Sequence, residues 1–317
     1  MSTEVDLPKE QLTSKKVNLA IAALFLAVFA MSWTPILIRW SVREVSPVVT
    51  IFWREAIAFI PLGLWVNFKR LSAQESSEEP PYKLDKSTKF LLVAASIVVS
   101  CCALLYTVAI TQTSVANSAV IRSLVPLFTT IPAWLIFRQS FGYQFIIGMF
   151  LSIGGAITIG LEDSQISLHN LQGDVISLIS AMFYAGYLLI VEKLRTQVDT
   201  TTILLWRVIV GMVLLLPVIL ITRDPIFPAS INGWLSVITL ALLGQIIGQG
   251  SVAYSLNKLS SGLVAVTLLL VPAISAIIAW LIFAENLSLL NWLSLFVILL
   301  GIYLAVSSKE AVKTIQN

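Results

Sequence analysis

Charged residues, histidine and cysteine are all scarce in this chain. Only 12% of its 317 residues are charged, and it has one histidine and two cysteines. Soluble domains are about 25% charged, so this composition, with a mean hydropathy of +0.91, indicates an integral membrane protein. The adjacent Cys101 and Cys102 are unable to form a disulfide framework and are interpreted as packing residues. Because His169 stands alone in a predicted loop, no metal or other cofactor is expected.

Catalytic and nucleotide-binding motifs are also missing. The chain has no P-loop, HExxH or GxSxG sequence, which argues against ATP-driven transport and against the common hydrolase classes. The longest polar connection, residues 72–87, has the mixed charge of a solvated linker. We therefore expect neither an enzyme nor a protein with a nucleic-acid partner.

Long apolar runs fill the chain instead. Ten windows approach the roughly 20 residues that a bilayer core requires; they cover residues 18–40, 47–68, 89–110, 115–137, 142–161, 173–192, 201–222, 233–255, 262–283 and 289–308. The sequence thus predicts an all-α integral membrane protein with ten transmembrane helices.

The lysines and arginines at or beyond the ends of these windows are unevenly distributed. If the N-terminus is inside, only Arg39, Arg43 and Arg223 fall on the outer side. By the positive-inside rule, this distribution predicts that the polar tails, residues 1–17 and 309–317, are both cytoplasmic. The expected location is the plasma or inner membrane, where lipid surrounds a multi-pass protein.

Two halves of the chain resemble each other. "AVIRSLVPLFTTIPAWLIF" at residues 119–137 aligns without gaps on "AVTLLLVPAISAIIAWLIF" at residues 265–283, with 11 of 19 positions identical. The pair Trp53-Arg54 likewise matches Trp206-Arg207. Each repeat then contains five helices, and an odd number inverts the second copy relative to the first. Inverted repeats are typical of secondary transporters, whose substrate site lies near the midplane and opens to each side in turn.

These paired stretches and the five-plus-five arrangement resemble the EamA family of the drug/metabolite transporter superfamily. The similarity covers nearly the whole chain, and it divides the chain into repeats at residues 18–161 and 173–308. The resemblance implies a ten-helix bundle with a central cavity and transport of small metabolites, usually export of amino acids and related compounds.

Away from their ends, the predicted spans contain three arginines and one glutamate, and an ionisable side chain at such a depth is costly and marks a candidate functional site. Arg54 and Arg207 belong to the repeated Trp-Arg pair, which favours a gating or structural role over direct substrate contact. Glu55 is replaced by Val208 in the second repeat. Because adjacent helical residues point about 100° apart, Glu55 is expected to have a partner elsewhere. The alternatives are a coupling proton or an ion pair with an arginine such as Arg122.

Arg122 lies deepest of the three arginines and is replaced by Leu268 in the second repeat. Pro126 and Pro272, four residues after Arg122 and Leu268, each remove a helical hydrogen bond and predict a kink. A guanidinium beside a freed carbonyl suits a carboxylate or phosphate, which arginine grips with two hydrogen bonds. The alternative is a structural ion pair with Glu55.

Polar and aromatic residues at similar depths complete the predicted substrate site. They are Trp33, which precedes a break expected at Pro35, together with Asn117, Tyr184, Tyr187, Gln245 and Gln249. Tyr184 and Tyr187 are expected to share a helix face. For each residue, a hydrogen bond or packing contact between helices is the simpler explanation. Gly244 and Gly248 form a small-xxx-small pattern that permits close helix contact.

The sequence thus predicts a secondary transporter that moves a small metabolite by alternating access. Three arginines near the pathway favour an amino acid or related carboxylate, and export is the favoured direction. An exchanger of phosphorylated metabolites and a multidrug exporter are the alternatives, and a channel or membrane enzyme is the rival class. Proton coupling stays open, and the sequence does not indicate an oligomeric state.

Overall fold

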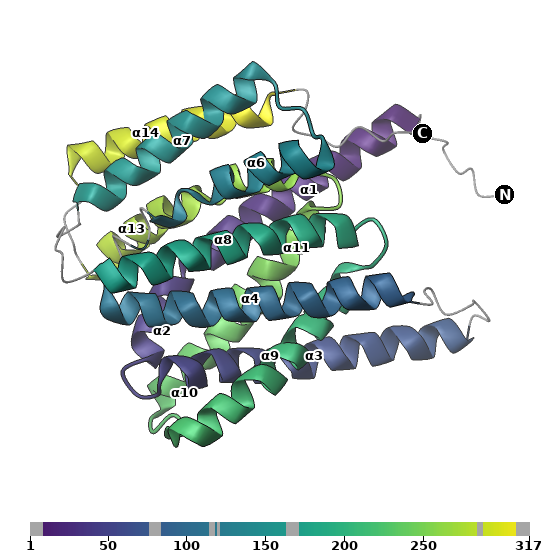
Figure 1. The fold of residues 1–317 in the computed structure, drawn as a ribbon, viewed down its shortest axis with the longest axis vertical. Coiled ribbons are helices and arrows are strands. Elements are labelled where there is room, and N and C mark those ends of the chain that lie inside the picture. Colours follow the sequence, from purple (N-terminus) through teal and green to yellow (C-terminus); the bar gives the residue numbers. More distant parts are fainter. Residues whose placement is uncertain are drawn as a thin grey trace.

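The computed structural model describes residues 9–75, 84–113, 118, 121–162, 171–283 and 288–308, and the elements within these ranges are helices (Figure 1). The first half contains α1 (Lys9–Ser32), α2 (Thr34–Ser41), α3 (Pro47–Glu75), α4 (Lys86–Gln112), α6 (Val125–Phe137) and α7 (Tyr143–Glu162). The second half contains α8 (Leu171–Leu194), α9 (Thr200–Thr222), α10 (Ile231–Thr239), the π-helix η2 (Leu240–Gln249), α11 (Gly250–Ser255), α12 (Ser261–Thr267), α13 (Leu270–Phe283) and α14 (Leu289–Val306).

Many of these helices are apolar over a length that suits a bilayer. In the described part of the chain, seven helical segments are long and apolar enough to cross a membrane. The shorter apolar helices are Val125–Phe137, Tyr143–Thr158 and Ser261–Ser275. The predicted all-helical membrane protein is therefore confirmed at this level. α1 begins at Lys9, so part of the predicted N-terminal tail is already helical.

Several apolar segments are interrupted at the expected positions. α1 ends at Ser32, and α2 starts one residue later with Pro35 in its first turn. Pro126 lies in the first turn of α6, and turns separate α6 and α13 from the helical residues before them. A proline lacks the N–H that would continue the preceding helix, so the kinks predicted at Pro126 and Pro272 are present as breaks.

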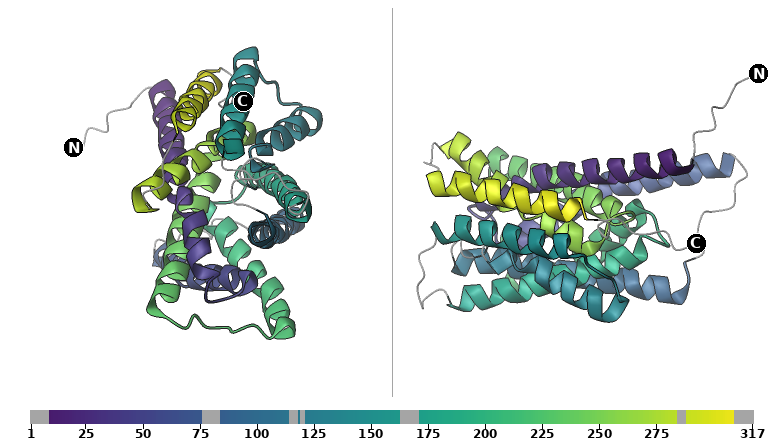
Figure 2. Two further views of the ribbon diagram at one scale, coloured as in Figure 1. Left: turned by 90° about the vertical axis from the view of Figure 1, so that its left-hand side faces the viewer. Right: turned by 90° about the horizontal axis from the view of Figure 1, so that it is seen from above.

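The long helices run side by side along one common direction (Figure 2). The main contacts pair α7 with α14, α4 with α8, and α3 with α9. α1 packs in turn along η2 and α11, and α6 lies against α12. The first turn of α1 and the last turn of α14 lie at the same end of the bundle (Figure 1).

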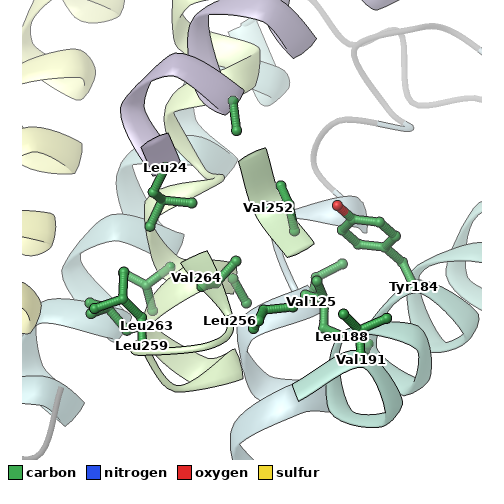
Figure 3. Packing of buried hydrophobic residues seen from close by; sticks show 14 of the residues in the cluster. Leu24, Val125, Tyr184, Leu188, Val191, Val252, Leu256, Leu259, Leu263 and Val264 are labelled. Atoms are coloured by element: carbon green, nitrogen blue, oxygen red, sulfur yellow. The ribbon is translucent and has the colours of Figure 1, made fainter. Parts of the chain in front are cut away.

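The largest buried apolar cluster joins the two halves of the chain. Leu24 of α1 and Val125 of α6 pack with Leu188 of α8, Val252 of α11 and Val264 of α12 (Figure 3). Tyr184 belongs to the same cluster (Figure 3). Apolar packing therefore places this tyrosine, together with its polar neighbours, between the two halves.

Candidate functional site

Arg54 and Glu55 form an ion pair with each other. Arg54 Nη2 lies 2.7 Å from Glu55 Oε1, and both side chains are buried. The expectation that Glu55 needs a partner other than Arg54 is therefore wrong. The helical angle fixes only the directions of the two Cβ atoms, and the long arginine stem folds back far enough to reach its neighbour. No ion pair between Glu55 and Arg122 is present among the described residues.

Arg207 faces the same ion pair from α9. Its side chain is 3% exposed, its Cζ lies 5.5 Å from the centre of the Tyr187 ring, and it interacts electrostatically with Glu55. Its Nε and Nη1 atoms have no hydrogen-bond partner in the described part of the chain. Arg207 thus brings a second buried cation to Glu55 without a direct ion pair.

Gly211, one helical turn beyond Arg207, brings α9 close to this cluster. A Cβ atom at Gly211 would lie 3.2 Å from Ser100 Oγ of α4 and 3.3 Å from Glu55 Cγ of α3. The absence of a side chain lets three helices meet around one carboxylate. Glu55 Oε2 and Ser100 Oγ are buried and lack partners among the described residues, and the Tyr187 hydroxyl lies beside the Arg207 guanidinium.

Arg122 is held by aromatic rings and hydroxyls. Its Cζ lies 4.5 Å from the centre of the Tyr106 ring and 5.2 Å from that of Tyr184, both within cation–π range. Its Nη1 donates to Ser180 Oγ at 3.4 Å, and Cys102 lies against the same serine at 3.5 Å. The guanidinium is therefore positioned by neutral groups, which leave its charge available to an anion.

The two tyrosines of α8 connect the environments of Arg122 and Arg207. Their ring centres are 6.1 Å apart, as expected for residues that share a helix face. Gln249 Nε2 of η2 donates to the Tyr184 hydroxyl at 3.4 Å, whereas Gln249 Oε1 has no partner in the described ranges. Arginines, tyrosines and an amide from both halves thus meet in one buried region.

The remaining predicted site residues are placed less directly. Gln245 is fully buried, and neither of its amide atoms has a partner among the residues that the structure describes. It lies in a π-helix, a rare conformation that often occurs at functional sites. Trp33 packs against the same apolar cluster as Tyr106. Asn117 lies outside the described residues.

Close packing of α1 and α2 on η2 follows the small-xxx-small pattern. A Cβ at Gly244 would lie 3.2 Å from Thr34 Oγ1, and one at Gly248 would lie 2.6 Å from Met31 Cγ. Larger residues at these two positions would separate the helices, so the packing interpretation is confirmed. This packing holds the break between α1 and α2 beside the π-helix η2.

Several residues of the site were not predicted. Tyr106 and Ser180 contact Arg122, and Cys102 had been interpreted only as a packing residue. Ser180 precedes Tyr184 by one helical turn, and Tyr106 follows Cys102 by one turn, so helical spacing could have placed both on the site face. Nothing in the sequence indicates that α4 and α8 pair across the halves.

Cys102 offers a chemical reporter for this site. In a Cys101→Ser variant, a saturating transported solute is expected to slow the modification of Cys102 by N-ethylmaleimide several-fold, because Cys102 is buried beside the groups that contact Arg122. The rate is measured by mass spectrometry. In the matched Cys102→Ser variant, transport should resist the reagent. A Cys102 rate that is unchanged by every transported solute would place the binding site elsewhere.

Hydrogen bonds also join the halves near one end of the bundle. Glu44, between α2 and α3, accepts from the backbone N–H of Ser230 at 3.1 Å and from its hydroxyl. Trp53 Nε1 donates to the Ile226 carbonyl at 2.6 Å, and its ring lies 4.9 Å from that of Trp234. These residues, named here the Glu44 network, link the α2–α3 connection to the α9–α10 connection.

A second network lies at the opposite end (Figure 1). Glu192, near the end of α8, accepts from Gln139 Nε2 at 3.0 Å and from the backbone N–H of Ser261 at 3.1 Å. Thr88 of α4 donates to Gln197 Oε1 at 2.8 Å. We refer to these five residues as the Glu192 network. Contacts between the halves are thus made on both sides of the arginine and tyrosine region.

The Glu44 contact has a defined pH dependence. Hydrogen bonds from the Ser230 hydroxyl and backbone N–H lower the pKa of the Glu44 carboxyl below its usual range. A carboxylate with a lowered pKa keeps its favourable contact above that pKa and loses it as the pH falls through it. The contact is therefore expected to be constant around neutral pH, and any pH dependence of activity there must arise from other groups.

Comparisons with known proteins agree with this architecture. The model of the EamA-like transporter family matches residues 18–161 and again residues 171–307. An uncharacterized transporter of Archaeoglobus fulgidus is 23% identical over 90% of this chain and 98% of its own length. The uncharacterized transporter YyaM of Bacillus subtilis is 23% identical over 84% and 86%. A WAT1-related chloroplastic protein of Arabidopsis thaliana is 23% identical over 83% of this chain and 64% of its own length.

The fold has a counterpart among solved structures. The crystal structure of another protein matches with a TM-score of 0.74 at 13% identity, over 90% of this chain and 96% of that chain. The helical, apolar architecture and the named relatives define a multi-pass membrane transporter. The chain belongs to the EamA-like transporter family.

Proposed function

We propose that this protein is a secondary transporter that moves a small metabolite bearing a carboxylate, such as an amino acid, by alternating access. The main support is the cluster of Arg122, Arg207, Tyr184 and Tyr187 between two networks that join the halves. A central site with separable contacts on both sides is what alternating access requires. Export, through the plasma or inner membrane, is the proposed direction because it is the usual activity that the family resemblance implies.

The proposal includes ten spans arranged as two inverted repeats, at residues 18–161 and 173–308. Corresponding contacts at the two ends support it. Glu44 contacts the N-cap residue of α10, and Gln197 contacts the first turn of α4. Trp53 and Trp206 of the repeated pair follow Glu44 and Gln197 by the same number of residues. One type of contact thus recurs at opposite ends of the bundle.

The proposed orientation has both termini in the cytoplasm. The start of α1 and the end of α14 share one end of the bundle (Figure 1), and most lysines and arginines flank that end in the sequence. The Glu192 network would then be the cytoplasmic one and the Glu44 network the outer one. Both networks would have to open in turn during a transport cycle.

Glu55 is proposed to couple transport to a driving ion or an exchanged solute. Its ion pair with Arg54 would be the contact that changes during coupling. Its carboxylate is shared electrostatically between Arg54, which it bonds, and Arg207, which lies nearby. An anion bound to Arg207 would weaken the attraction between Arg207 and Glu55, and a proton on Glu55 would weaken its attraction to both arginines. Either change would alter the contact between α3, which holds Glu55, and α9, which holds Arg207. The same role of Glu55 is compatible with transport driven by protons and with transport driven by exchange of solutes.

Crosslinking the two end networks tests alternating access. In a background with Cys101 and Cys102 replaced by serine, a short bifunctional thiol reagent is applied to Glu44→Cys with Ser230→Cys, or to Gln139→Cys with Glu192→Cys. Each crosslink is expected to stop flux while solute still binds from the opposite side, and a cleavable reagent should restore flux. The single cysteine variants serve as controls. Unchanged flux in both crosslinked proteins would contradict alternating access.

A further inference from the structure

Positive charges outnumber negative ones in the middle of the bundle. Arg54 is neutralised by Glu55 at 2.7 Å, whereas the groups around Arg122 in the described part of the chain are two tyrosine rings, the Ser180 hydroxyl and Cys102. Arg207 shares the same carboxylate only at longer range. In the described part of the chain, Glu55 is the one acidic residue more than a turn from a helix end. Arg207, which is buried, and Arg122, which is partly buried, therefore lack a close counter-charge among the described residues.

The spare donors around Arg207 point to a missing ligand. Arg207 Nε and Nη1 and Ser100 Oγ are buried and unpaired among the described residues, as is Glu55 Oε2, and the Tyr187 hydroxyl lies beside the Arg207 guanidinium. Leaving one buried donor or acceptor without a partner costs about 1–3 kcal/mol. Several such atoms occur together here, so a ligand that paired with them would recover this free energy. Gly211 holds Ser100 and Glu55 against the same stretch of α9. The arrangement offers an anion several donors from three helices.

The tyrosine pair sets the relation between the two arginines. The Arg122 guanidinium lies over Tyr184, and the Arg207 guanidinium lies over Tyr187. With the two ring centres 6.1 Å apart, the cations occupy separate positions along α8. A solute with two anionic groups therefore has one arginine position for each group.

We propose that Arg207, with Tyr187 and Ser100, forms a second anion site, and that the transported solute carries two separated carboxylates, one for Arg122 and one for Arg207. This inference rests on the proposed transport function and narrows its substrate class. A dicarboxylate neutralises both excess charges, and an acidic amino acid also presents one carboxylate to each arginine although its ammonium group adds a positive charge. A monocarboxylate leaves one arginine without a carboxylate. A phosphate monoester concentrates its charge on one head group, so it fits one arginine position and leaves the other.

Competition in proteoliposomes tests the inference with solutes that differ in one charge. The purified full-length protein is assayed for counterflow of glutarate against butyrate, and of glutamate against glutamine. The wild type is expected to exchange the solute with two carboxylates at least 10-fold more efficiently in each pair. Arg207→Gln should lose that preference by about 10- to 100-fold while keeping the slower exchange of the solute with one carboxylate.

Controls separate the possible failures. Arg39→Gln, which changes an exposed arginine in α2, should retain the wild-type preference, and Arg207→Lys should retain part of it. Saturable exchange by the wild type that favours neutral or singly charged solutes would overturn the two-anion inference and leave the transporter in place. Equal losses for both members of each pair in a folded Arg207→Gln protein would make Arg207 structural. No counterflow of any solute would overturn the transport function as well.

Discussion

Gly148→Ala is expected to destabilise the folded protein, although alanine normally strengthens a helix. A Cβ at Gly148 of α7 would lie 2.7 Å from the backbone nitrogen of Ala305 in α14 and would also meet the Gly301 carbonyl. Backbone atoms cannot move aside unless the two helices separate. Such overpacking costs about 1–3 kcal/mol, more than the roughly 0.5–1 kcal/mol that alanine adds to helix stability.

The melting temperature of the purified protein in detergent measures this effect. We expect Gly148→Ala to lower it by about 5 °C. Gly154→Ala is the matched control, because Gly154 lies on the exposed face of the same helix and a Cβ there would have no atom within 4 Å. Its melting temperature should stay the same or rise. Equal falls in both variants would show that α7 and α14 do not pack this closely.

Arg122→Gln is expected to abolish efficient transport of carboxylate-bearing solutes. The guanidinium is held by Tyr106, Tyr184 and Ser180, and it has no ion pair with a carboxylate among the described residues, so a substrate anion would supply its counter-charge. A charge-assisted hydrogen bond contributes about 1.5–3 kcal/mol, which predicts a fall in kcat/KM of about 10- to 100-fold. Exchange assays in proteoliposomes measure the change.

The same assays contain the control for Arg122. Arg39→Gln should transport like the wild type, because Arg39 is exposed near the end of α2. Arg122→Gln should also keep a melting temperature close to that of the wild type, since glutamine can still bond to the Ser180 hydroxyl. Full transport of every anionic solute by Arg122→Gln would give Arg122 a structural role only.

Local signals in the sequence predicted much of the helical architecture. Prolines mark the breaks before α2, α6 and α13, because each removes a backbone donor from its own helix. The spacing of Tyr184 and Tyr187 placed them on one face for an equally local reason. Features of this kind depend on neighbours a few residues away, so the sequence contains them directly.

Other features depend on contacts between distant segments. The pairing of α4 with α8 brings Cys102 to Ser180, and the pairing of α7 with α14 sets Gly148 against Gly301. The small residues of α7 are visible in the sequence, but their partner helix is not. The π-helical conformation around Gln245 likewise has no recognised local signal.

The Arg54–Glu55 pair shows where a local rule gave the wrong answer. The rule that adjacent residues diverge by about 100° applies to the start of a side chain. In water an arginine has no reason to fold back along its helix, but in an apolar interior the nearby carboxylate is its strongest partner. Burial, which depends on the whole fold, therefore decided this contact.

Counterflow by the wild-type protein is the most direct test of the proposed carrier. Proteoliposomes are preloaded with one unlabelled solute from a panel of amino acids, organic acids, phosphorylated metabolites and neutral drugs, and the labelled solute is then added outside. A carrier with one alternately exposed site predicts a saturable, transient accumulation of label above its equilibrium level for carboxylate-bearing solutes. Unsaturable equilibration without that overshoot, or exchange confined to neutral and cationic compounds, would contradict the proposal.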